Sequence, residues 1–176
     1  NKTMFADPEK ILKNFGIADT MIVADFGAGS GFYSIPAAKM AQNGKVYAIE
    51  IQKDFLATLK DKAEKENIGN IEILWSDIEK TAGTRLNDSI ADVVIFSNIL
   101  FQVVHKEKVL EEAYRILRNG GRVLFIDWSE VSTFSPRKEN LIMPTVAREM
   151  FKAQKFVYDK DIDAGEHHYG MIFRKI

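Results

Sequence analysis

Residues 24–31 read ADFGAGSG, and this glycine-rich stretch decides the fold of the chain. A short apolar run at 21–26 leads into it, and a run with helical spacing, containing Ile35, Ala37 and Ala38, follows it. In an open α/β sheet, a glycine-rich turn between a buried strand and a helix lies at the carboxyl edge, where such sheets bind their ligands. The stretch therefore predicts an α/β domain with a ligand site beside residues 27–31.

The remaining hydrophobic pattern alternates between short strand-like runs and longer helical ones, which is typical of a parallel α/β sheet. Further strands are predicted at 45–51, 71–75, 92–97 and 122–126, and helices at 52–66 and 106–119. Towards the chain end we expect a helix near 145–154 and two strands at 156–162 and 167–174, joined by a turn at 163–166. The expected fold is a doubly wound, mostly parallel seven-stranded sheet that finishes with an antiparallel hairpin pair.

Length and composition predict a single domain. The chain has 176 residues, of which 46% are apolar and 28% charged, the balance of one globular domain. Asp7 and Pro8 are typical of the start of a helix, as cap and first helical residue. We expect an N-terminal helix within 1–20, a ligand-binding core at 21–128 and a C-terminal helix and hairpin at 129–176.

Composition also excludes several classes of function. The chain contains no cysteine, which rules out disulfides, cysteine-rich zinc sites and cysteine nucleophiles. A net charge of -1 gives no overall field that attracts nucleic acid or an anionic membrane. Apolar runs are far shorter than the roughly 20 residues of a membrane span, so we predict no membrane insertion and a cytoplasmic location.

The glycine spacing disfavours a nicotinamide dinucleotide. A dinucleotide fingerprint has its third glycine one position later, where this chain has Phe32, and rarely has a carboxylate where Asp25 stands. A ligand that carries an ammonium and a sulfonium instead gains from an anionic group beside the loop.

With these residues, the chain resembles the class I S-adenosylmethionine-dependent methyltransferases, whose first motif is acidic-x-Gly-x-Gly-x-Gly. The likeness extends to YAIEI at 47–51, SDI at 76–78, LRNGGRVL at 117–124 and the closing hairpin. The resemblance implies a Rossmann-like fold, S-adenosyl-L-methionine as cofactor and methyl transfer by in-line displacement.

The resemblance also implies a set of cofactor-binding residues. Asp25 and the backbone of the glycine loop would hold the methionine part, Glu50 the ribose hydroxyls, Ile51 one face of the adenine, and Asp77 its amine. The full predicted set is Asp25, Gly27, Ala28, Gly29, Gly31, Glu50, Ile51, Asp77, Ile78 and Asn98. Chemistry supports Glu50 independently, because an ionised carboxylate accepts two hydrogen bonds from a vicinal diol.

The candidates for catalysis each have a structural alternative. Asn98 follows the fourth strand, where the family places a residue near the transferred methyl, but an amide there also caps loops. Asp127 ends the fifth strand and is a candidate base or a turn cap. Among the cofactor contacts, Asp77 also has a structural alternative, because aspartate is a good helix cap or turn residue.

The histidines and aromatic residues are interpreted mainly as structural. His105 is expected at the surface or as a cap, and His167 and His168 point to opposite faces of a strand, so no metal site is predicted. Trp75 and Trp128 lie at or beside strand ends and are interpreted first as packing residues. Trp128 and Tyr33 are candidates for the wall of an acceptor pocket.

The acceptor is only partly constrained. The sequence SNIL at 97–100 lacks the Pro-Pro-aromatic run that holds exocyclic amines or amides, and without cysteine cytosine-C5 and thiol-assisted arsenite methylation are excluded. The overall plan is most similar to small-molecule and quinone-ring methyltransferases, with the 129–145 loop or a second subunit closing the pocket. Nucleic acid or protein acceptors are also possible, and the protein is expected to be a monomer or a homodimer.

Two other functions are alternatives to methyl transfer: a non-catalytic nucleotide-binding regulatory module and a NAD-dependent oxidoreductase.

Overall fold

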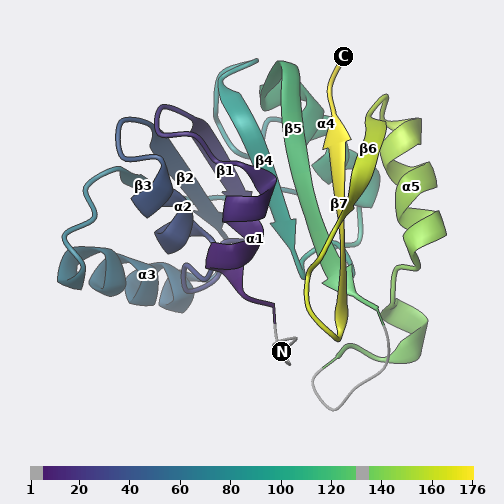
Figure 1. Cartoon of the computed structure of the whole chain (residues 1–176), viewed down its shortest axis with the longest axis horizontal. Helices are drawn as coiled ribbons and strands as arrows, with labels where there is room; N and C mark the ends of the chain where they lie inside the picture. The colour runs from purple at the N-terminus through teal and green to yellow at the C-terminus, as the bar shows by residue number, and fades with distance from the viewer. Residues whose placement is uncertain (1–5, 130–134) are drawn as a thin grey trace.

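The computed structural model describes residues 6–129 and 135–176. Within them, a seven-stranded sheet has the order β3-β2-β1-β4-β5-β7-β6 (Figure 1). The strands are β1 (Ile22–Phe26), β2 (Lys45–Glu50), β3 (Ile71–Trp75), β4 (Ala91–Ser97), β5 (Leu117–Trp128), β6 (Val157–Ile162) and β7 (His168–Arg174). Strands β1 to β5 are parallel, whereas β7 is antiparallel to both of its neighbours. The predicted fold class is therefore confirmed, including the closing hairpin.

Helices cover both faces of this sheet. They are α1 (Pro8–Phe15), α2 (Ser34–Met40), α3 (Lys53–Lys65), α4 (Lys106–Ile116) and α5 (Pro144–Ala153), with a short 3-10 turn η1 (Lys138–Asn140). Buried residues of α1 and α2 share one cluster with the sheet, and α3 packs on the same side. Helices α4 and α5 contribute to the cluster on the other side. The arrangement has three layers, as a parallel sheet that is buried on both faces requires.

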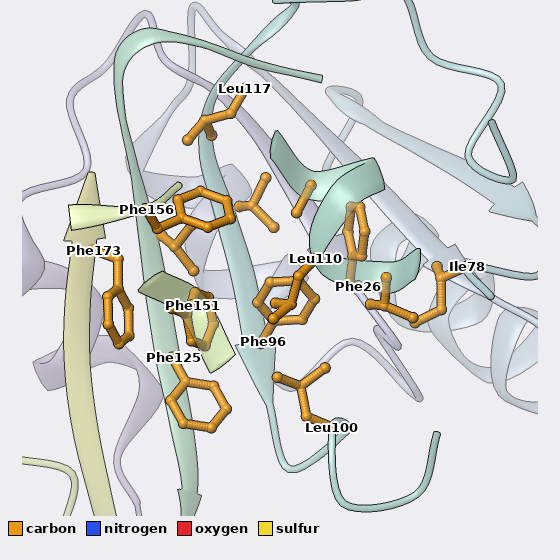
Figure 2. Close-up of a cluster of buried hydrophobic side chains, with 14 of the residues drawn as sticks. Phe26, Ile78, Phe96, Leu100, Leu110, Leu117, Phe125, Phe151, Phe156 and Phe173 are labelled. Carbon is orange, nitrogen blue, oxygen red and sulfur yellow. The ribbon is translucent and has the colours of Figure 1, made fainter. Parts of the chain in front are cut away.

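Aromatic side chains dominate the α4 and α5 face. Figure 2 shows Phe96, Phe125 and Phe173 from three strands around Phe151 of α5. The Phe151 and Phe173 rings stack with centroids 4.0 Å apart. This cluster fixes the positions of β4, β5 and β7, and therefore of the residues that follow or precede them at the carboxyl edge.

The N-terminal helix is capped as its sequence predicts. The Asp7 side chain accepts a hydrogen bond from the Lys10 backbone N–H at 3.2 Å, and Gly16 ends the helix with φ of 85°. A cap of this kind satisfies a backbone donor that the first helical turn leaves free.

The boundary between α4 and β5 corrects the sequence analysis. The helix predicted through Asn119 ends at Ile116, and Leu117 already has extended backbone. The Gly120 N–H donates to the Lys175 carbonyl at 2.8 Å, and the Lys175 N–H donates to the Gly121 carbonyl at 3.0 Å. Hydrogen bonding to the end of the chain therefore draws this segment into the sheet, a long-range effect that helical periodicity does not contain.

Among the described residues, no helix combines the length and the apolar character that crossing a bilayer requires. Part of the predicted lid at 129–145, namely residues 130–134, lies outside the described residues.

Candidate functional site: a pocket at the carboxyl edge of the sheet

The glycine loop connects β1 to α2 at the carboxyl edge of the sheet. Gly27, Gly29 and Gly31 all have positive φ, at 71°, 53° and 90°. Residues other than glycine adopt a positive φ only at an energetic cost, because their Cβ crowds the backbone. Glycine at these three positions therefore allows the conformation of the loop. The Gly27 and Ala28 N–H groups both donate to the Ile49 carbonyl of β2, at 2.9 and 3.0 Å.

The three glycines have different surroundings at the place where a Cβ would lie. A Cβ on Gly27 would lie 2.6 Å from Ile99, and one on Gly31 would lie 2.2 Å from Leu59. Those two glycines admit neighbouring protein side chains. A Cβ on Gly29 would meet nothing within 4 Å, so only Gly29 opens the loop onto free space.

Glu50 ends β2 beside this loop and is 7% exposed. One carboxylate oxygen accepts from the Gly29 N–H at 3.0 Å, and the other accepts from the N–H groups of Ile51 and Gln52, each at 2.9 Å. Three backbone donors thus fix the carboxylate at the rim of the glycine loop. A carboxylate has about four lone-pair sites, so a diol that binds both oxygens must displace one of these bonds.

A pocket of about 90 Å³ adjoins Glu50. It brings together five of the predicted residues, Gly27, Glu50, Ile51, Asp77 and Ile78, and is completed by Ile49, Ser76, Glu79, Ile99 and Val103. A larger hollow of about 280 Å³ shares Ile51 and Asp77 and continues along Trp75. Asp77 also accepts from the Glu79 N–H at 3.0 Å, so its side chain forms a turn at the pocket wall. A carboxylate beside an apolar slot is suited to a nucleoside, whose sugar is polar and whose base is flat.

Asp25 lies outside the described pockets. Its carboxyl group is 3% exposed and accepts a hydrogen bond from the Ser34 hydroxyl at 2.6 Å. Burial raises the pKa of Asp25 to about 6, against the opposing effect of the Ser34 bond. With a pKa of about 6, Asp25 is still mostly ionised at pH 7 and becomes neutral only in weakly acidic solution. Its contact with a cofactor stays a prediction.

The two predicted catalytic residues lie farther along the same edge. Asn98 follows β4 with φ of 53°, and its amide nitrogen lies 3.1 Å from Nε2 of His168. Asp127 is fully buried near the end of β5, and burial raises its pKa to about 7, opposed by the Trp128 N–H and more weakly by Lys106. The structure brings Asn98 and His168 together, whereas no described hydrogen bond joins Asp127 to either.

His168 is the site residue that sequence reasoning missed. It starts β7, is 8% exposed, and its ring lies 4.2 Å from the Trp128 ring. Because side chains alternate along a strand, His168 and His167 point to opposite faces of the sheet. The position of His168 beside the end of β4 follows only from the register in which His168 pairs with Trp128.

The residues around Glu50 fit an adenosyl group. Gly29 faces space that a side chain would fill, Glu50 offers a buried carboxylate, and Ile51 and Ile78 line the adjoining slot. Together they offer hydrogen-bond acceptors for the sugar of a nucleoside and apolar surface for its base.

Comparisons with known proteins agree with this geometry. A family model described as "Methyltransferase domain" matches residues 17–173. The ubiquinone/menaquinone biosynthesis C-methyltransferase UbiE of Hydrogenovibrio crunogenus is 29% identical over 119 residues, which are 66% of this chain and 46% of that protein. An arsenite methyltransferase of Halobacterium salinarum is 26% identical over 113 residues, 64% of this chain and 28% of that protein.

A solved structure is similar over nearly the whole chain. The crystal structure of a SAM-dependent methyltransferase from Aquifex aeolicus has a TM-score of 0.90 and 27% identity, and the match covers 98% of this chain and 92% of the other. The chain belongs to the class I S-adenosylmethionine-dependent methyltransferase family. That family implies S-adenosyl-L-methionine as the cofactor. The chain spans less than half the length of the two curated relatives described above.

Proposed function

We propose that this protein transfers the methyl group of S-adenosyl-L-methionine to a small molecule. The observation that carries the proposal is the Glu50 carboxylate, held by three backbone N–H groups at the rim of an apolar slot and beside the open space of Gly29. An adenosyl compound matches this combination of diol acceptor, apolar slot and close backbone, and the family supports S-adenosyl-L-methionine as that compound.

In this proposal the predicted cofactor-binding residues have defined tasks. Glu50 accepts hydrogen bonds from the ribose, and Asp77 accepts from the adenine amine. Ile51 contacts one face of the adenine, and Ile78 offers its backbone N–H nearby. The backbone of residues 27–31 and Asp25 hold the methionine part. When bound, the cofactor supplies a methyl group activated by a positively charged sulfur, so the protein mainly aligns the acceptor and excludes water.

The relatives and the composition support a small-molecule acceptor. One relative is named for ubiquinone and menaquinone biosynthesis and another for arsenite. Because this chain has no cysteine, thiol-assisted arsenite chemistry is disfavoured and an organic acceptor is favoured. A cytoplasmic location and the single-domain division at 1–20, 21–128 and 129–176 stay predictions alongside this proposal.

Ligand-dependent thermal stability tests the cofactor. S-adenosyl-L-methionine and its demethylated product S-adenosylhomocysteine should each raise the melting temperature, whereas NAD should not. A ligand at a hundred times its dissociation constant adds about 2.7 kcal/mol of stability. Stabilisation by NAD alone would favour the oxidoreductase alternative and overturn the proposal.

Methyl transfer itself needs a second measurement. Protein incubated with cofactor carrying a radiolabelled methyl group and a small-molecule extract should move label into low-molecular-weight products. Binding of the cofactor without transfer to any fraction of the extract would instead favour a regulatory module.

A further inference from the structure

Four buried polar side-chain atoms have no hydrogen-bond partner among the described residues, and one of them, Oη of Tyr33, lies at the start of α2. The other three are Oδ1 of Asn98, Oδ2 of Asp127 and Nδ1 of His168. Leaving a buried polar atom unpaired is energetically costly, so such atoms require an explanation, and binding a ligand is one. All three come from the ends of β4 and β5 or the start of β7, which are adjacent strands.

Two of these residues form a couple. The amide of Asn98 contacts Nε2 of His168 at 3.1 Å, while the second polar atom of each group is buried without a hydrogen-bond partner. A neutral imidazole has one N–H and one lone pair, and the amide nitrogen and oxygen exchange places by a half turn. In either orientation the couple therefore leaves one donor and one acceptor without a partner.

The residues around Asn98 and His168 restrict the kind of ligand group that can bind there. Burial, with a smaller contribution from His167, lowers the pKa of His168, so its imidazole is neutral near pH 7. The half-buried Trp128 ring packs 4.2 Å from the imidazole at 34° and adds a flat apolar wall. A hydroxyl group both donates and accepts a hydrogen bond, which a methyl ether cannot do.

We infer that Asn98 and His168 form the acceptor subsite and bind a phenolic or enolic hydroxyl, with His168 as the base that receives its proton. This inference rests on the proposed function. The productive orientation has the Asn98 amide oxygen accepting from Nε2–H of His168, which leaves the Nδ1 lone pair directed at the hydroxyl. The same amide oxygen then stabilises the imidazolium that forms.

The step balances without a further reactant. The acceptor O–H bond breaks and its proton moves to Nδ1 of His168. The electron pair left on oxygen then forms the bond to the methyl carbon. In an enolate or phenolate, the conjugated carbon can form this bond instead of the oxygen. The bond from that carbon to sulfur breaks, and its electron pair remains on sulfur as a neutral thioether. After attack through carbon, the carbon that gained the methyl group loses a proton to solvent.

Imidazole NMR tests the inference, because the chain has only three histidines. Protein with ¹⁵N-labelled histidine is loaded with S-adenosylhomocysteine and titrated with phenol or with its methyl ether, anisole. A His168→Gln variant assigns the His168 signals. Phenol should shift the ring nitrogens of His168, whereas anisole should leave them in place.

A variant of the partner residue sharpens the result. Asn98→Gly removes the amide, and glycine accepts the positive φ of this position without strain. Affinity for phenol should fall roughly fivefold to tenfold, the loss expected for one neutral hydrogen bond. An equal response of His168 to phenol and anisole, or no response to phenol, overturns the inference. Failure of the parent protein to bind S-adenosylhomocysteine would instead refute the proposed function.

Discussion

The two halves of the sheet's carboxyl edge treat their polar groups in opposite ways. On the β1 to β3 side, the Glu50 carboxylate has three backbone donors and Asp77 has one. On the β4, β5 and β7 side, Asn98, Asp127 and His168 each keep a buried polar atom without a partner among the described residues. The Glu50 and Asp77 carboxylates of the first side already have partners within the protein, whereas the three unpaired atoms of the second side gain hydrogen bonds only from a further molecule.

The largest loss of cofactor affinity should come from filling the space beside Gly29. Gly29→Val places a branched side chain in the open space beside Glu50, so S-adenosylhomocysteine affinity should fall by more than about a thousandfold, or 4 kcal/mol. Isothermal titration calorimetry measures this loss. Unchanged affinity in a folded variant would remove the glycine loop from the binding site.

Gly120 offers a matched control for that substitution. Its φ is 76°, and an added Cβ would meet nothing within 4 Å, as at Gly29. Gly120 lies near the amino end of the parallel part of β5, away from the pocket edge. Gly120→Val should therefore show similar backbone strain in thermal unfolding and keep full cofactor affinity.

The second effect concerns the unsatisfied side and depends on pH. The pKa of Asp127 is raised from 3.8 to about 7, so the folded state binds this proton more tightly than the unfolded chain does. The stability that it contributes is present below pH 3.8 and is lost as pH rises through about 7. Asp127→Asn removes this loss, because the asparagine stays neutral.

The variant should therefore gain stability relative to the parent as pH rises from 4 to 8, by about 2–4 kcal/mol. Urea unfolding at several pH values measures the difference. Asp61→Asn, at an exposed position on α3, is the control and should show no such trend. A difference between parent and Asp127→Asn that does not change with pH would place the carboxylate in contact with water.

The contrast between the two sides also explains what the sequence could predict. Glu50 was predictable because a carboxylate that ends the second parallel strand must lie beside the loop after the first. Local spacing also sufficed for the hairpin turn, in which the Gly165 N–H donates to Asp163 at 3.2 Å.

Features that depend on distant pairing could not be predicted. His168 lies beside Asn98 only because β7 pairs with β5 in one register, and strand alternation says which faces differ but not what covers them. The need for glycine at 27 and 31 also reflects distant contacts, because Ile99 and Leu59, which an added Cβ would meet, come from other segments.

The smallest of the three effects tests how the β1 to β3 side admits its ligand. Three of the roughly four lone-pair sites on Glu50 are occupied, so a ribose diol must displace one bond. Glu50→Gln keeps the shape, but it removes the charge and leaves one side-chain oxygen to accept. S-adenosylhomocysteine affinity should fall by about 1–3 kcal/mol, roughly fivefold to 150-fold, as for losing a charge-assisted hydrogen bond.

Glu72→Gln is the control for this substitution, because Glu72 is a surface carboxylate paired with Lys45. Calorimetry on both variants separates the loss at Glu50 from the effect of a general change in charge. Equal affinities for the parent and Glu50→Gln would mean that the ribose binds elsewhere and that the three backbone bonds of Glu50 serve the fold alone.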